Sequence, residues 1–207
     1  MKKQPSCLVL SVMLLLSAPA QAGMLGVDAL GGLNHTTWFM NPVPTGSTLS
    51  PGLGFNAGAM INFNPISLIT VEVGGFYSTR SISVGFGPIT QSLSFGAIQI
   101  PFLVRLNPIP FLSLGFGGFY QMAIGSVNVN NSVTGASSTT FALANLSTSS
   151  VGLMASLQGR FNLPLTGLSV LGRVNYLFGL TNDTTVASTF AGLRDLQFQA
   201  GVGYEFL

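Results

Sequence analysis

Hydrophobic and polar residues alternate along much of the chain, most clearly in its last stretch, residues 196–206. One set of positions is apolar and ends in aromatic residues: Leu196, Phe198, Ala200, Val202, Tyr204 and Phe206. The positions between them are polar or small: Gln197, Gln199, Gly201, Gly203 and Glu205. A period of two places these sets on opposite faces of a β-strand. The stretch therefore predicts a strand with one apolar face.

The most apolar stretch, residues 98–122, keeps the same period although it contains prolines, glycines and an arginine. Residues 107–110, Asn-Pro-Ile-Pro, divide it and favour a turn. The stretch therefore predicts a hairpin with an apolar outer face and small residues toward a narrow interior. Pro101 cannot donate a hydrogen bond to a neighbouring strand, so we expect a local bulge or an unpaired site there.

Extended over the chain, the alternation predicts eight strands, with ends placed to about two to four residues. They lie near residues 24–38, 53–64, 67–82, 92–106, 111–127, 149–163, 168–180 and 195–206. The connections alternate between short turns at 64–66, 107–110 and 164–167 and longer segments at 39–52, 83–91, 128–148 and 181–194. Outer-membrane barrels combine short periplasmic turns with longer outer loops. Both termini are therefore expected on the periplasmic side.

Composition distinguishes a membrane barrel from a soluble β-protein. Only 6% of the residues are charged and the mean hydropathy is positive, whereas a soluble domain carries about 25% charged residues. Beyond the N-terminal segment, no run of about 18 apolar residues is free of proline, glycine clusters and charge, which argues against transmembrane helices. Backbone groups in lipid must be paired within the protein. We therefore predict an all-β, eight-stranded, antiparallel up-and-down transmembrane β-barrel.

The N-terminal residues 1–22 predict a cleaved secretory signal peptide. Lys2 and Lys3 precede an apolar core at residues 8–16, and the Ala-Gln-Ala of residues 20–22 is a cleavage site of small residues. The apolar core is too short to span a bilayer.

Removal of that segment leaves a barrel domain over residues 23–207. Its five arginines balance its five acidic residues, so the formal net charge of +2 belongs to the signal peptide and does not indicate nucleic-acid binding. Cys7, the only cysteine, is also removed. The mature chain is therefore expected to contain no disulfide and no cysteine-ligated metal. No cofactor is expected either, because no cofactor-binding motif is present.

The chain resembles small bacterial outer-membrane β-barrel proteins, the porin-like "outer membrane protein β-barrel domain" group. The resemblance rests on residues 99–105, 114–118, 173–180 and the last strand. It implies the cell outer membrane of a Gram-negative bacterium, contact with outer-membrane lipids, and biogenesis by periplasmic chaperones and the barrel-assembly machinery. It implies no single activity, because such barrels include adhesins, lipid-modifying enzymes and pores.

The last strand also resembles the signal that the barrel-assembly machinery reads. Gly201, Tyr204 and Phe206 supply the glycine and the two alternating aromatic residues, although Leu207 follows the usual terminal Phe. Other outward aromatic residues are expected in girdles at the membrane interfaces. With Tyr204, the predicted girdle comprises Trp38, Phe102, Tyr120, Tyr176 and Phe178.

Six charged residues fall on the predicted inward face, toward the periplasmic half: Asp28, Glu72, Arg105, Arg160, Arg173 and Glu205. An eight-stranded barrel is just wide enough for its side chains to fill it, and buried charges need partners. Three arginines and three carboxylates are therefore expected to pair and to close the lumen. The alternative is a proton or ion path.

His35 is the only histidine and lies near the outer end of the first strand. An outer-leaflet lipid-modifying enzyme would use such a histidine with positioned partners. Ser47 and Ser50 are the nearest candidates in a loop. The simpler interpretation is an interfacial polar residue beside Trp38, and no motif indicates a metal site, a phosphate loop or a catalytic nucleophile.

The segment 128–148 is predicted to be the longest loop, polar and uncharged. Loops on a rigid scaffold are common binding surfaces, and the absence of charge argues against capture of polyanions. We therefore expect a non-enzymatic barrel with a filled lumen and outer loops for envelope or surface interaction, including an extracellular ligand. The alternatives are a narrow diffusion pore for small solutes and a lipid-modifying enzyme that uses His35.

Overall fold

The structure is a computed structural model of the whole chain, and it describes residues 25–38, 47–86, 89–131, 137–142, 149–164, 166–180 and 193–206. The predicted signal peptide, residues 1–22, lies outside these ranges. Within the described ranges, no helix is long and apolar enough to cross a membrane.

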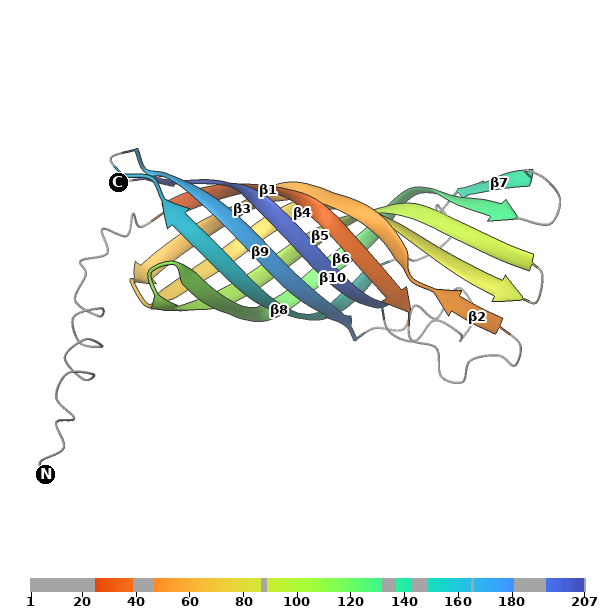
Figure 1. Cartoon of the computed structure of the whole chain (residues 1–207), viewed down its shortest axis with the longest axis horizontal. Helices are drawn as coiled ribbons and strands as arrows, with labels where there is room; N and C mark the ends of the chain where they lie inside the picture. The colour runs from red at the N-terminus through yellow and green to blue at the C-terminus, as the bar shows by residue number, and fades with distance from the viewer. Residues whose placement is uncertain are drawn as a thin grey trace, which may run out of the picture.

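Eight long strands form a closed antiparallel barrel (Figure 1). They are β1 (Leu25–Trp38), β3 (Gly52–Ile66), β4 (Ile69–Phe86), β5 (Ile89–Ile109), β6 (Leu112–Asn131), β8 (Ser149–Asn162), β9 (Leu168–Gly179) and β10 (Leu193–Phe206). Each strand pairs with the next one in this series, and β1 pairs with β10 to close the barrel. The predicted eight-stranded up-and-down barrel is thus confirmed.

The two ends of the barrel differ in their connections. The end with the short turns also holds the Leu25–Phe206 pair, and we call it the turn end. We call the opposite end the loop end. At the turn end β3 and β5 run two to three residues further than predicted, through Ile66 and Ile109, and the ladders are irregular just before these residues. The irregular pairing accommodates Pro65 and Pro108, which lack an N–H, inside strands rather than in turns.

At the loop end, strands replace much of what the sequence predicts as loop. The expected loop at 83–91 is wrong for most of its length, because β4 continues to Phe86 and β5 begins at Ile89. Serine and threonine suggested a loop, but they alternate with apolar residues and pair across the strands. The Oγ atoms of Ser83 and Ser92 lie 2.8 Å apart in a hydrogen bond.

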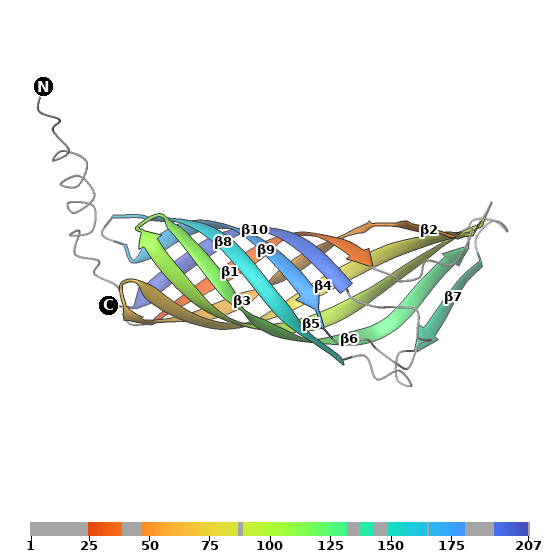
Figure 2. The same ribbon diagram turned by 90° about the horizontal axis from the view of Figure 1, so that it is seen from below.

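Two short strands join this part of the molecule. β2 (Ser47–Ser50) pairs with β4, and β7 (Ser137–Ala142) pairs with β6. They lie within the predicted loops 39–52 and 128–148, so these segments are partly strand. Because β4, β5 and β6 also pair with one another, the sheet β2-β4-β5-β6-β7 extends past the other strands on one side of the barrel (Figures 1 and 2). We call the part of this sheet that lies beyond the ends of the other strands the outer extension.

The interruption expected at Pro101 lies between β4 and β5. Pairing runs up to Val73–Phe102 and resumes at Phe76–Gln99 with an unchanged register. The disturbance is therefore an unpaired site rather than a bulge, since no extra residue is inserted. On its other side, Pro101 stays in register with β6.

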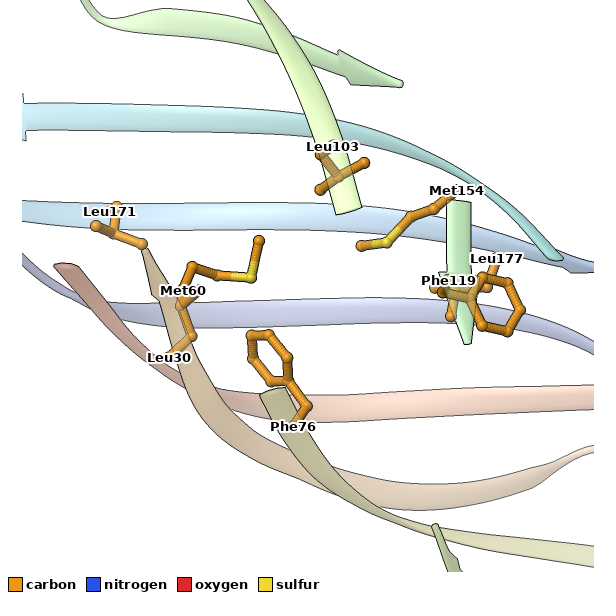
Figure 3. Close-up of a cluster of buried hydrophobic side chains, with 8 residues drawn as sticks. All are labelled: Leu30, Met60, Phe76, Leu103, Phe119, Met154, Leu171 and Leu177. Carbon is orange, nitrogen blue, oxygen red and sulfur yellow. The ribbon is translucent and has the colours of Figure 1, made fainter. Parts of the chain in front are cut away.

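Side-chain exposure alternates along the strands, as the sequence pattern predicts. In β9 exposed and buried residues follow each other without interruption. The outward side chains are mainly large and apolar, whereas polar and charged side chains dominate the buried inward set. Apolar side chains fill part of the interior (Figure 3): Leu30, Met60, Phe76, Leu103, Phe119, Met154, Leu171 and Leu177.

Candidate functional site

The inward face of the barrel near the turn end brings together all six charged residues that the period-two pattern places inside. They come from six strands, and we call them the turn-end cluster: Asp28, Glu72, Arg105, Arg160, Arg173 and Glu205. Asp28, Glu72, Arg105 and Arg173 are buried, while Arg160 and Glu205 keep side-chain exposures of 16% and 20%. The more exposed pair lies closest to the turn end, because β8 and β10 both end there.

Arg160 binds two carboxylates on neighbouring strands. Its Nη2 donates to Asp28 Oδ1 and Oδ2 at 2.7 and 2.6 Å, and its Nη1 donates to Glu205 Oε1 at 3.1 Å. β9 lies between β8 and β10, and both β9 and β10 lie between β8 and β1, so the guanidinium spans part of the lumen. Charge-assisted bonds of this kind are stronger than neutral ones.

Arg173 connects the two halves of the cluster. Its Nη2 lies 3.1 Å from Glu72 Oε1 and 3.6 Å from Asp28 Oδ2. Glu72 also pairs with Arg105, whose Nε lies 2.6 Å from Glu72 Oε2. The ion pairs therefore form one connected path from β5 through β4, β9 and β1 to β8 and β10. This path crosses the lumen from wall to wall.

Glycines provide the space that these side chains occupy. A Cβ atom at Gly203 would lie 2.3 Å from Asp28 Oδ1, and a Cβ at Gly115 would lie 3.2 Å from Arg105 Cγ. Any larger residue at these positions would displace a charged side chain. The small inward residues noted in the sequence are thus the counterparts of the large charged ones.

Neutral polar side chains extend the cluster toward the loop end. Arg105 Nη2 donates to Ser156 Oγ at 2.8 Å, and Ser156 donates to Asn175 Oδ1 at 2.6 Å. Asn175 Nδ2 then donates to Gln199 Oε1 at 2.9 Å, and Gln199 Nε2 to Asn56 Oδ1 at 2.6 Å. Sequence reasoning missed this chain, although each residue lies on the inward face by the period of two.

A second ion pair lies at the loop end and was also missed. Arg80 on β4 contacts Asp195 on β10, and both side chains are fully buried. The same alternation that places Glu72 inside places Arg80 inside, and Asp195 shares its face with Glu205. The alternation therefore contained the signal, although neither Arg80 nor Asp195 was assigned to the inward face from the sequence.

His35 lies on the outward face of β1. Its cross-strand neighbours are Leu53 on β3 and Leu196 on β10. Ser50 lies on β2, opposite Ser83, and β2 pairs with β4 rather than with β1. The side chain of Ser47 lies outside the described part of the structure. No group of three or more His, Cys, Asp or Glu residues suited to a metal ion occurs among the described residues.

The predicted girdle and assembly-signal residues also have defined places. Phe102, Tyr120, Tyr176, Phe178 and Tyr204 all point outward and are exposed. Phe102 lies within β5, between the outward residues Ile100 and Val104, rather than at a strand end. The side chain of Trp38 lies outside the described part.

The C-terminal residues combine exposed rings with a tight backbone contact. The Tyr204 and Phe206 rings meet edge to face, with centroids 5.2 Å apart. Gly201 faces inward, and a Cβ atom there would lie 2.0 Å from the Ala29 carbonyl oxygen. β10 therefore approaches β1 closely at this glycine.

An apolar outer wall around a filled polar interior defines the class of transmembrane β-barrels. The family model described as "Outer membrane protein beta-barrel domain" matches residues 8–206, and the chain belongs to this family. The family places the chain in the bacterial outer membrane. No curated protein matches the sequence.

Three solved structures match most of this chain, each with low sequence identity. Neisserial surface protein A is 12% identical, with a TM-score of 0.49, and the match covers 89% of this chain and 99% of that one. OprG from Pseudomonas aeruginosa is 12% identical, with a TM-score of 0.48 and coverages of 89% and 97%. Ail of Yersinia pestis, in complex with the heparin analogue sucrose octasulfate, is 12% identical, with a TM-score of 0.44 and coverages of 88% and 99%.

Proposed function

We propose that this chain is a non-enzymatic, non-conducting outer-membrane barrel that acts through its loop end. The observation that carries the proposal is the turn-end cluster, whose ion pairs connect strands on opposite sides of the lumen. An eight-stranded barrel leaves little space beyond its own side chains. Ions would have to displace a connected set of buried charges to pass.

The interior above the cluster supports the same conclusion. Large apolar side chains such as Met60 and Phe76 are buried there (Figure 3). The hydrogen-bonded amides of Asn175, Gln199 and Asn56 also lie in the interior. Apolar side chains raise the barrier for ions, because an ion would lose hydration without gaining a partner.

The outer extension supports a role in surface interaction. It holds β2 and β7 in pairing with longer strands, so that the predicted loop 128–148 starts from an ordered sheet. Binding residues are often displayed on loops that a rigid scaffold positions. We infer that this face contacts the envelope surroundings or an extracellular ligand.

Export and assembly complete the proposal. We infer that residues 1–22 are removed on export and that Gly201, Tyr204 and Phe206 are read by the barrel-assembly machinery, with periplasmic chaperones carrying the unfolded chain. Mass spectrometry of the chain purified from outer membranes should give a mature N-terminus at Gly23.

The test of the proposed function is single-channel conductance of the barrel refolded in detergent and inserted into planar bilayers. A heat-modifiable gel shift confirms the folded state beforehand. The wild-type protein should give no steady openings. Regular openings would contradict the closed lumen and support the narrow pore instead.

A further inference from the structure

The loop-end ion pair spans the lumen instead of following the wall. Arg80 lies on β4 and Asp195 on β10, and the strand order places β3 and β1 between them. The two side chains therefore meet across part of the interior. Asp195 pairs in register with Thr36, close to the end of β1, so the contact lies where the barrel opens toward the loop end.

β4 and β10 each carry one residue of the turn-end cluster and one residue of the loop-end pair. The spacing of these residues along each strand shows that the two sets of charges are well separated. β4 supplies Glu72 to the turn-end cluster and Arg80 to the loop-end pair, with Phe76 buried on the same face between them. β10 supplies Glu205 and Asp195, which lie near opposite ends of the strand. Among the described residues, no ion pair joins the loop-end pair to the turn-end cluster.

The loop-end pair has few direct hydrogen bonds for two buried charges. Arg80 Nε and Nη1 and Asp195 Oδ1 are buried without a protein partner among the described residues, and so are Asn34 Oδ1 and Ser78 Oγ. Buried polar groups of this kind are usually hydrogen-bonded to ordered water. A group left unsatisfied in the interior costs stability, so this region favours hydration.

We propose that Arg80 and Asp195 form a hydrated latch that closes the loop end of the lumen independently of the turn-end cluster. The proposal rests on the proposed function, a lumen that does not conduct. When the Arg80–Asp195 pair is broken, water and small solutes can enter from the loop end as far as the buried side chains between the two ends. The turn-end cluster still blocks the rest of the lumen. The barrel thus has an outer vestibule whose entrance is one ion pair.

The test uses a cysteine placed just below the latch. Ser78 is fully buried, lies on the same face as Arg80 and is close in size to cysteine. The reporter is Ser78→Cys in a full-length chain that carries Cys7→Ser, so that it holds the only thiol. Membrane-impermeant methanethiosulfonates, one cationic and one anionic, are added to intact cells that display the folded protein. A variant that changes only the local charge should speed the reaction with one reagent and slow it with the other. A variant that opens the lumen should speed the reaction with both.

With the latch intact, the reporter should react slowly with both reagents. Asp195→Asn and Arg80→Gln remove one charge each and keep a polar side chain. Each should raise both labelling rates at least about tenfold, because the charge-assisted bond that holds the two side chains together across the lumen is lost. The exchange of Arg80→Asp with Asp195→Arg should restore slow labelling. Arg160→Ala, which breaks the turn-end cluster, should leave the rates unchanged.

Rates unchanged in both single variants, with a heat-modifiable folded band, would overturn the latch. An equal increase from Arg160→Ala would also overturn it, because the two ends would then open together. Conductance of the same samples is recorded separately. Steady wild-type openings would refute the closed lumen, whereas silent barrels with unchanged labelling would refute only the latch.

Discussion

The two ends of the lumen hold buried charge in different ways. At the turn end Asp28 and Glu72 each contact two arginines, so that every carboxylate belongs to a connected network. At the loop end Arg80 and Asp195 have only each other as ionic partners among the described residues, and Arg80 Nε and Nη1 and Asp195 Oδ1 have no protein hydrogen-bond partner there. The comparison shows that one barrel can combine a connected network of buried charges with an isolated buried ion pair.

The difference follows from what surrounds each set of charges. The turn-end cluster lies below amides and apolar side chains and has glycines that fit it closely, as at Gly203. Buried ion pairs are stable when further hydrogen bonds satisfy the remaining atoms. The loop-end pair is fully buried, but Arg80 Nε and Nη1 and Asp195 Oδ1 have no protein partner among the described residues.

The largest expected effect is at Glu72, which joins Arg105 and Arg173. Glu72→Ala leaves Arg105 without a carboxylate deep in the barrel, which should lower the free energy of unfolding by about 3–5 kcal/mol. Urea unfolding in lipid vesicles measures the change. As a control, Arg194→Ala removes an arginine whose guanidinium lies 5.3 Å from the Phe178 ring centroid and should cost about 1 kcal/mol or less. Equal losses would show that the network does not carry stability.

A smaller loss is expected when the space for the cluster is filled. A Cβ at Gly203 would lie 2.3 Å from Asp28 Oδ1 and 2.6 Å from Ser169 Oγ, so Gly203→Ala should cost about 1–3 kcal/mol through overpacking. Gly172→Ala is the matched control, because a Cβ there meets nothing within 4 Å. The free energies of unfolding of the two variants are compared with that of the wild type. If Gly203→Ala were as stable as Gly172→Ala, the close fit at the turn end would be contradicted.

At the loop end the loss of one charge should cost less than at the turn end. Arg80→Ala should lower the free energy of unfolding by less than about 2 kcal/mol. This loss lies between those measured for exposed ion pairs and for broken buried ion pairs. The reason is that, in the proposed latch, the freed Asp195 carboxylate becomes hydrated. The same vesicle unfolding experiment applies. A loss as large as that of Glu72→Ala would remove the distinction between the two ends.

The smallest effect is expected when both loop-end charges are replaced by apolar residues. Arg80→Met combined with Asp195→Leu should change the free energy of unfolding by no more than about 1 kcal/mol, because replacement of a whole buried ion pair is often neutral. The double variant is compared with Arg80→Ala under identical conditions. If it were the less stable of the two, the charges themselves would be needed for the fold.

The alternation of polar and apolar residues was sufficient to predict the number of barrel strands, their antiparallel order, and the faces of the last strand and of the hairpin at 98–122. It placed Arg105 and Glu72 inside and Phe102 and Tyr204 outside, as the structure does. A period of two reports the face of a residue directly, because successive side chains point to opposite sides of a strand. That information is local and needs no knowledge of the partner strands.

Which inward residues meet was decided only by the tertiary structure. Arg160 and Asp28 come together because the barrel closes with a particular register between β1 and β10, and no local pattern contains that register. The same holds for Arg80 and Asp195, and for the outer extension, where Ser83 and Ser92 become strand residues only through their partners. Side-chain direction is a property of one strand, whereas ion pairing across a lumen depends on the closure of the whole sheet.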